Sequence, residues 1–140
     1  MGSCGSAGSL RTLALKGKVF SGKGEGRKFT ELEWVRKQIE SQLGFTPCLG
    51  TLNARLDRKA TESKKTLSKI EATAEIVPSE DFSSGRCYEA HLLHDVKCAL
   101  VVPQIANYPE DVIEIIAPVN LREKLRLKDG DTIEIKIRLR

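Results

Sequence analysis

Three glycines alternate with charged residues in the stretch SGKGEGRKF, which covers residues 21–29. Glycines at every second position let backbone N–H groups point into one concavity, and three cations accompany them just before a helix signal. This combination suits the binding of phosphate groups. The spacing matches neither the dinucleotide-binding pattern GxGxxG nor the Walker pattern, so both of those phosphate loops are excluded. Taken alone, the stretch leaves a phosphate cradle and an ordinary mobile turn both open.

Two neutral oxygen ligands, Thr51 and Asn53, stand two residues apart in the stretch GTLN. If residues 51–56 form a strand, alternation places both side chains on one face. Mg²⁺ prefers oxygen donors and usually completes its shell with water and substrate phosphates, so one hydroxyl and one amide oxygen could suffice. The alternative is that both side chains only satisfy backbone groups at the start of the strand.

A single carboxylate, Glu114, interrupts the apolar run of residues 112–117. On a half-buried strand it points either to solvent or to the mouth of a barrel. At a mouth it could position or deprotonate a substrate hydroxyl, whereas an outward carboxylate would have no role. The residues alone leave these two readings open.

Four potential zinc ligands, Cys87, His91, His94 and Cys98, fall in one short segment. On a strand, alternation sends two of them to each face, and on a helix the ends of the stripe lie too far apart for one tetrahedral ion. At most a pair could therefore bind a metal. We expect the cysteines to be small packing residues and the histidines to be surface or paired groups.

The elements that must position these residues are mainly strands. Alternating apolar residues predict strands over residues 13–20, 51–56 and 132–139, and the last should direct Ile133, Ile135 and Ile137 inward. Further β-rich segments, separated by Pro, Ser, Gly, Asn and Asp, are AEIVP, CYEAHLLHDV, KCALVVPQI and VIEIIAP. About six strands with one or two peripheral helices indicate a mainly β protein built as a small closed barrel.

The main helix is predicted to begin at Thr30 and to stop before Gly44. Thr30 and Glu33 have the spacing of a capping box, and Phe29 and Trp34 have the spacing of a hydrophobic staple. Gly44 stands where a helix usually ends in the left-handed conformation. A second, short helix is predicted in NLREKLRL, and a Lys-Asp-Gly-Asp turn then leads into the last strand.

Length and composition fit one compact domain over residues 11–140. We interpret residues 1–10 as an expression scar or linker, and we exclude Cys4 with them. No apolar run approaches the roughly 20 residues needed to cross a bilayer, so the protein is expected to be cytoplasmic, without membrane contact. The net charge of +4 is spread along the chain, apart from a cationic run at residues 58–69 that we expect to be solvated. Nucleic acid is not an expected partner, because few aromatic residues are present.

Four segments together resemble the archaeal CTP-dependent riboflavin kinase family: SGKGEGRKF, LGFTPCLGTLN, VIEIIAPVNLREKL and LKDGDTIEI. Each is weak alone, but their order and spacing over residues 13–140 are specific. The resemblance implies a cradle-loop β-barrel of Greek-key type. It also implies transfer of the γ-phosphoryl group of CTP to the 5′-hydroxyl of riboflavin, giving FMN and CDP, by a protein expected to be monomeric.

The resemblance also assigns roles to residues. Its nucleotide-binding residues would be Lys23, Gly24, Glu25, Gly26, Arg27, Lys28, Val119, Asn120, Leu121 and Arg122. Thr51 and Asn53 would hold Mg²⁺. Glu114 would bind the flavin, orienting its ribityl chain, and our hypothesis for catalysis is that it accepts the hydroxyl proton. Ala106 stands where we expect a flavin-contacting Thr in many relatives, so its missing hydroxyl should weaken or alter the flavin contact.

Two other functions stay in competition. The segment LREKLRLKDGDTIEIKI also resembles the helix, turn and strand of swapped-hairpin transcription regulators, which bind DNA. Such a regulator would need a concentrated basic surface, and it would have no use for GTLN or for the glycine stretch. The second alternative is a barrel that binds flavin or nucleotide without catalysis, which Ala106 keeps open.

Overall fold

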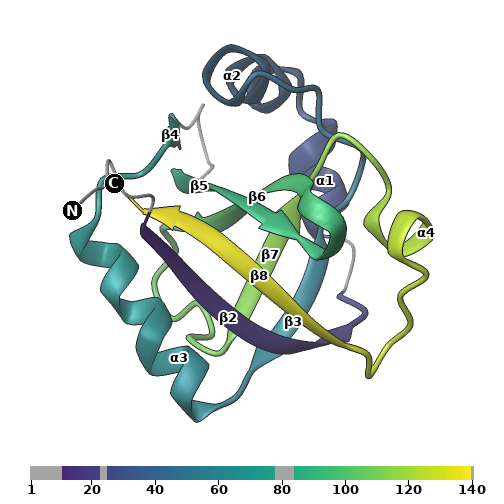
Figure 1. The fold of residues 1–140 in the computed structure, drawn as a ribbon. Helices are drawn as coiled ribbons and strands as arrows, with labels where there is room; N and C mark the ends of the chain where they lie inside the picture. Colours follow the sequence, from purple (N-terminus) through teal and green to yellow (C-terminus); the bar gives the residue numbers. More distant parts are fainter. Residues whose placement is uncertain (1–10, 23–24, 78–83, 140) are drawn as a thin grey trace, which may run out of the picture.

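Six antiparallel strands close into a barrel in the computed structural model, which describes residues 11–22, 25–77 and 84–139 (Figure 1). The strands are β2 (Arg11–Phe20), β3 (Leu52–Leu56), β4 (Ala74–Ile76), β5 (Gly85–Leu92), β6 (Val96–Pro103), β7 (Val112–Ile116) and β8 (Thr132–Leu139). Their order is β4-β5-β6-β7-β3-β2-β8, and pairing of β5 with β8 closes the ring. β4 is an extra strand at the edge of β5. The predicted mainly β, closed barrel is confirmed.

The barrel interior is filled by alternate residues of each strand. Ile133, Ile135 and Ile137 of β8 are buried there, as predicted, together with Ile113 and Ile115 of β7. The residues between them face outward, because successive side chains of a strand point to opposite faces. Alternation therefore decides which residues of β3 and β7 can reach the outer surface of the wall.

A second apolar cluster covers part of that outer surface. It lies beneath helix α2 (Glu33–Leu43), which directs Val35, Ile39 and Leu43 onto the barrel wall. Figure 1 shows α2 at the top of the molecule, with α1 (Glu25–Glu31) beside it. α2 ends at Gly44, whose φ of 80° is the left-handed conformation predicted for this stop.

The predicted start of the main helix is wrong. Thr30 is not an N-cap, because the chain is already helical in α1, and α2 begins after the extended residue Leu32, which makes no side-chain cap. Thr30 is instead buried, and its hydroxyl donates to the Arg27 carbonyl at 3.1 Å and accepts the Gly50 N–H at 2.7 Å. The hydroxyl is used to fasten α1 to the segment before β3.

The cationic run forms a helix that lies apart from α1 and α2. α3 (Arg58–Lys64) is capped by Asp57, whose carboxylate accepts the Ala60 N–H at 2.7 Å, and the 3₁₀ turn η1 (Lys65–Lys69) follows. Its cations are exposed as expected, except for Lys64, which is half-buried. α4 (Leu121–Leu125) and the 3₁₀ turn η2 (Leu93–Asp95) complete the helices of the described chain. None of the described helices has the length and apolar character to cross a membrane.

The two strand cysteines lie on opposite faces of the barrel wall. Cys87 packs beneath α2 and Cys98 packs in the interior, so the predicted packing role is confirmed. Burial raises the pKa of each thiol to about 12. Among the described residues, no group of three or more His, Cys, Asp or Glu side chains is placed to hold a metal ion.

Candidate functional site

Asn53 of β3 and Glu114 of β7 lie opposite one another in the antiparallel register. Both are on the outer face of the barrel wall, because Leu52 and Ala54 on one strand and the neighbours of Glu114 on the other fill the interior. Glu114 is half-buried. It is therefore neither at the barrel interior nor simply solvent-facing, and it has specific partners.

A chain of side-chain contacts runs through Glu114. Its Oε1 lies 3.2 Å from the Thr51 hydroxyl, which is also 2.9 Å from Asn53 Oδ1. Its Oε2 accepts a hydrogen bond from the Tyr108 hydroxyl. Burial, followed by the bond to Glu114 and its negative charge, raises the pKa of Tyr108 above its ordinary range. Tyr108 therefore remains a hydrogen-bond donor.

The Thr51 and Asn53 oxygens have the spacing that a hard cation requires. Adjacent corners of an octahedron with metal–oxygen distances of about 2.0–2.1 Å are about 2.9 Å apart. The Thr51 Oγ1 to Asn53 Oδ1 distance is also 2.9 Å. A hydroxyl has one proton, so if its lone pairs and the amide oxygen face a cation, that proton is left for Glu114. This donor set fits Mg²⁺.

Gly22 approaches Asn53 more closely than any other residue type could. A Cβ atom at Gly22 would lie 2.1 Å from Asn53 Nδ2. The backbone after β2 therefore passes directly over the Asn53 amide, and this explains the need for glycine here. The glycine stretch thus contributes to the site through Gly22.

Arg122 of α4 forms an ion pair with the turn before β8 and a hydrogen bond with the end of β2. The Arg122 guanidinium lies 2.7 Å from Asp129, 3.3 Å from the Phe20 carbonyl and 3.5 Å from Ser21 Oγ. The Ser21 hydroxyl also donates to Asp129. The hydrogen bonds from Arg122 and then Ser21 hold the pKa of Asp129 below its usual range.

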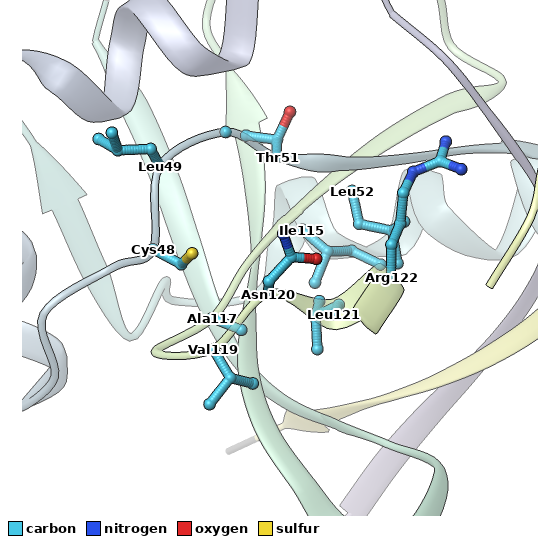
Figure 2. Close-up of a pocket in the computed structure, with 11 residues that line it drawn as sticks. Cys48, Leu49, Thr51, Leu52, Ile115, Ala117, Val119, Asn120, Leu121 and Arg122 are labelled. Carbon is cyan, nitrogen blue, oxygen red and sulfur yellow. The ribbon is translucent and has the colours of Figure 1, made fainter. Parts of the chain in front are cut away.

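Two adjoining cavities share Gly50, Thr51 and Arg122. We call the first, of about 120 Å³, the Thr51 cavity (Figure 2). Its lining residues are Cys48, Leu49, Gly50, Thr51, Leu52, Ile115, Ala117, Val119, Asn120, Leu121 and Arg122. The second, of about 200 Å³, is the Asn53 cavity, and it is lined by Phe20, Ser21, Gly22, Arg27, Gly50, Thr51, Asn53 and Arg122. In Figure 2 the segment carrying Cys48 to Thr51 faces the segment from Val119 to Arg122 across the Thr51 cavity.

A third cavity, of about 460 Å³, is lined by Tyr108, the residue that donates to Glu114 Oε2. We call it the Tyr108 cavity, and its lining residues include Lys64, Tyr88, Ala106, Tyr108 and Glu110. Lys64 Nζ donates to the Glu110 carbonyl at 2.9 Å and the Val112 carbonyl at 3.1 Å. Burial lowers the pKa of Lys64, and the negative charges of Glu110 and Asp111 offset this shift only in part. Tyr108 is the residue that both lines this cavity and contacts Glu114.

The residues expected to bind nucleotide fall into three groups. The structure gathers Val119, Asn120, Leu121 and Arg122 around the Thr51 cavity. Arg27 lines the Asn53 cavity, whereas Lys28 lines neither, and residues 25–28 form the first turns of α1 and not a loop. Lys23 and Gly24 lie outside the described residues.

Four contributions were not assigned to the site from the sequence: Gly22, Thr30, Tyr108 and Asp129. Gly22 belonged to the glycine stretch, but only its approach to Asn53 reveals its purpose. The sequence predicts Thr30 as a helix cap and Asp129 as a turn residue. Tyr108 lies in a segment without periodicity, where its closeness to Ala106 was the one available signal.

The chain is similar to a known family and to several curated proteins. The family model "CTP-dep_RFKase", described as "Domain of unknown function DUF120", matches residues 19–137. A protein named riboflavin kinase from Ignicoccus hospitalis is 41% identical over 132 residues, or 91% of this chain and 72% of that protein. Proteins of the same name from Pyrobaculum islandicum and Archaeoglobus fulgidus are 42% and 38% identical over 94% and 90% of this chain.

The chain spans only part of these relatives, covering 63% of the Pyrobaculum islandicum protein and 55% of the Archaeoglobus fulgidus protein. The match nevertheless includes every described element that forms the three cavities, since the family model extends from the end of β2 into β8. From the model match and the relatives together, the chain belongs to the CTP-dependent riboflavin kinase family.

Proposed function

We propose that this protein transfers the γ-phosphoryl group of CTP to the 5′-hydroxyl of riboflavin, giving CDP and FMN, with Mg²⁺ at Thr51 and Asn53. The observation that carries the proposal is the contact chain Asn53–Thr51–Glu114–Tyr108. It connects the Asn53 cavity, which Arg27 and Arg122 line, with the larger Tyr108 cavity. The guanidinium of Arg27 is paired with Glu31 and that of Arg122 with Asp129, and both have further N–H donors for a phosphate. Thr51 lines the Asn53 cavity and Tyr108 lines the Tyr108 cavity, and both contact Glu114, so a donor and an acceptor bound in these cavities would lie on either side of Glu114.

The Asn53 cavity and the Thr51 cavity, which we assign to CTP, differ in chemical character. Arginine side chains at the Asn53 cavity suit the triphosphate, because guanidinium groups bind phosphate oxygens with several directed donors. Leu49 and Val119, which are exposed large apolar residues beside the Thr51 cavity, suit the flat face of a base. We therefore assign the phosphates to the Asn53 cavity and the cytosine end to the Thr51 cavity.

The metal contribution is charge neutralisation. When bound, Mg²⁺ would neutralise the β- and γ-phosphate oxygens. The 2.9 Å spacing of the Thr51 and Asn53 oxygens supports this ligand pair. Thr51 and Asn53 would hold the metal, and the Thr51 hydroxyl would then direct its proton toward Glu114.

The transfer step balances without any further reagent. The riboflavin 5′-oxygen forms a bond to the γ-phosphorus as the bond from that phosphorus to the β,γ-bridging oxygen breaks, and CDP leaves. The hydroxyl proton passes to the Glu114 carboxylate and then to water. Positioning supplies much of the rate, because phosphoryl transfer needs aligned oxygens and neutralised charge more than covalent help.

The test is an assay of FMN formation. Purified protein with riboflavin and Mg²⁺ is given each of the four ribonucleoside triphosphates separately, with and without a chelator, and FMN is resolved chromatographically. We expect FMN chiefly with CTP and none after chelation. Faster FMN formation with another triphosphate than with CTP would overturn the donor assignment. Binding of CDP or riboflavin without any FMN would identify a barrel without catalysis, the alternative that Ala106 raises.

A further inference from the structure

The Glu114 carboxylate is held from two directions. Thr51, at the start of β3, lies within hydrogen-bond distance of Oε1, and Tyr108, on the connection between β6 and β7, donates to Oε2. A glutamate with one partner can still rotate about its terminal torsion, which is broad. Two donors on different oxygens fix the plane of the carboxylate and leave its remaining lone pairs to face a substrate.

The segment that carries Tyr108 is itself fastened. Lys64 of α3 donates to the carbonyls of Glu110 and Val112, and the Asp111 carbonyl accepts the Leu56 N–H at 2.6 Å. Asn107 adopts a φ of 64°, a left-handed conformation that Asn tolerates, and Tyr108 N–H bonds back to the Ile105 carbonyl at 3.2 Å. This tight turn brings the tyrosine hydroxyl to β7.

We propose that Tyr108 is a positioning residue for the reaction. Its hydroxyl orients the Glu114 carboxylate so that a free lone pair faces the acceptor hydroxyl at the Tyr108 cavity. This inference rests on the proposed function, because it assigns Tyr108 a part in the same proton transfer. The raised pKa of Tyr108 agrees with it, since a hydroxyl that keeps its proton at neutral pH remains a donor there.

The kinetic test compares Tyr108→Phe with the unaltered protein. Removing only the hydroxyl should lower kcat about tenfold. The KM for CTP should change by less than about twofold, because Tyr108 does not line the two cavities that we assign to CTP. Adding Glu114→Gln to Tyr108→Phe should cause no further loss beyond that of Glu114→Gln alone, since the two groups act as a unit.

Tyr88→Phe is the matched hydroxyl deletion. The Tyr88 hydroxyl is buried and donates to the Leu67 carbonyl at 2.9 Å, without contacting Glu114. The Tyr88 side chain also lines the Tyr108 cavity, so the control is read from its coupling to Glu114 and not from unchanged activity. Tyr88→Phe should lower the melting temperature, and its effect on kcat should add to that of Glu114→Gln without coupling. If Tyr108→Phe behaved in the same additive way, its role would be structural and the inference would be overturned.

A spectroscopic test needs no turnover. Because the chain has two tyrosines, Tyr88→Phe leaves Tyr108 as the only one, and its ionisation can be followed by ultraviolet absorbance. Glu114→Gln in this background should lower the pKa of Tyr108, since the bond to Glu114 and its charge both raise it. An unmoved titration would overturn the inference.

If the titration moves but the unaltered protein forms no FMN, the proposed function fails while the contact itself stands. If FMN forms and Tyr108→Phe keeps full kcat, the inference alone fails.

Discussion

Asn53 and Glu114 are paired directly across the ladder between β3 and β7, with both side chains on the outer face of the barrel. One strand pair therefore fixes both the metal ligand and the carboxylate that we propose as proton acceptor. Thr51, one residue before β3, bridges them. The backbone positions of Asn53 and Glu114 relative to one another are thus set by sheet register.

Asn53→Ala should lower the rate of FMN formation by at least about 100-fold, because it removes one of the two protein oxygens proposed for Mg²⁺. The melting temperature should change little, since Asn53 lies outside the barrel interior. The rate is measured as a function of Mg²⁺ concentration. Thr132→Ala is the control, because it changes an exposed strand residue outside the three cavities. Retained activity in Asn53→Ala would refute the metal assignment.

The fold was predictable where packing imposes a period. Residues 132–139 alternate strictly, and the structure buries Ile133, Ile135 and Ile137 as that pattern requires. Thr30 shows where local signals fail. Its spacing from Glu33 is that of a capping box, but a tertiary partner, the Gly50 N–H, takes the hydroxyl and the helix begins earlier.

The site was predictable in its parts but not in its assembly. Thr51, Asn53 and Glu114 each had a chemical reason to be noticed, and strand alternation correctly placed the first two on one side of the chain. Pairing with Glu114 depends on the register of two strands, in which Asn53 and Glu114 are 61 positions apart, and no local pattern encodes this register. The role of Tyr108 was not predictable for a similar reason, because its contact with Glu114 arises from a turn without apolar periodicity.

Gly22→Ala should raise the Mg²⁺ concentration needed for half-maximal activity by about tenfold or more. The new methyl group would lie 2.1 Å from Asn53 Nδ2, so the Asn53 amide must shift and its oxygen loses the present 2.9 Å spacing from the Thr51 hydroxyl. Stability should fall little, because a flexible side chain yields more readily than backbone. Gly85→Ala is the control, since its methyl group would meet Val101 at an ordinary 3.8 Å. An unchanged Mg²⁺ requirement in Gly22→Ala would contradict the proposed ligand geometry.

Arg122→Ala should raise KM for CTP about tenfold, because a charged phosphate contact is lost. Asp129→Asn should raise it less, because the Arg122 guanidinium remains but is no longer held in place by Asp129.

The lowered pKa of Asp129 gives a second readout, the dependence of stability on pH. Its stabilising contribution is present above the ordinary aspartate pKa of about 4 and is lost as pH falls through the lowered value. Melting temperatures of the unaltered protein and Asp129→Asn should therefore differ at pH 7 and converge in acid. A gap that persists in acid would argue against this ion pair.

Nucleotide should protect Cys48 from alkylation. Cys48 lines the Thr51 cavity and is half-buried, whereas Cys87 and Cys98 are buried with pKa values raised to about 12. In a Cys4→Ser background, iodoacetamide should label Cys48 first, and saturating CDP should slow that labelling about tenfold or more. Peptide mass spectrometry identifies the site, with Cys48→Ala as the control. Equal labelling with and without CDP would place the nucleotide elsewhere.

Both tyrosines should resist ionisation in the folded protein. Burial is the largest cause of the raised pKa of Tyr88, and burial with the Glu114 contact raises that of Tyr108. Unfolded tyrosines ionise near pH 10, so above that pH the unfolded state loses protons that the folded state retains. Stability should therefore be unaffected by these groups below about pH 10 and should decline as pH rises further. Tyrosinate absorbance at pH 10.5 should be smaller in the native protein than in urea, and a native protein with full tyrosinate absorbance at that pH would show that neither hydroxyl is held as described.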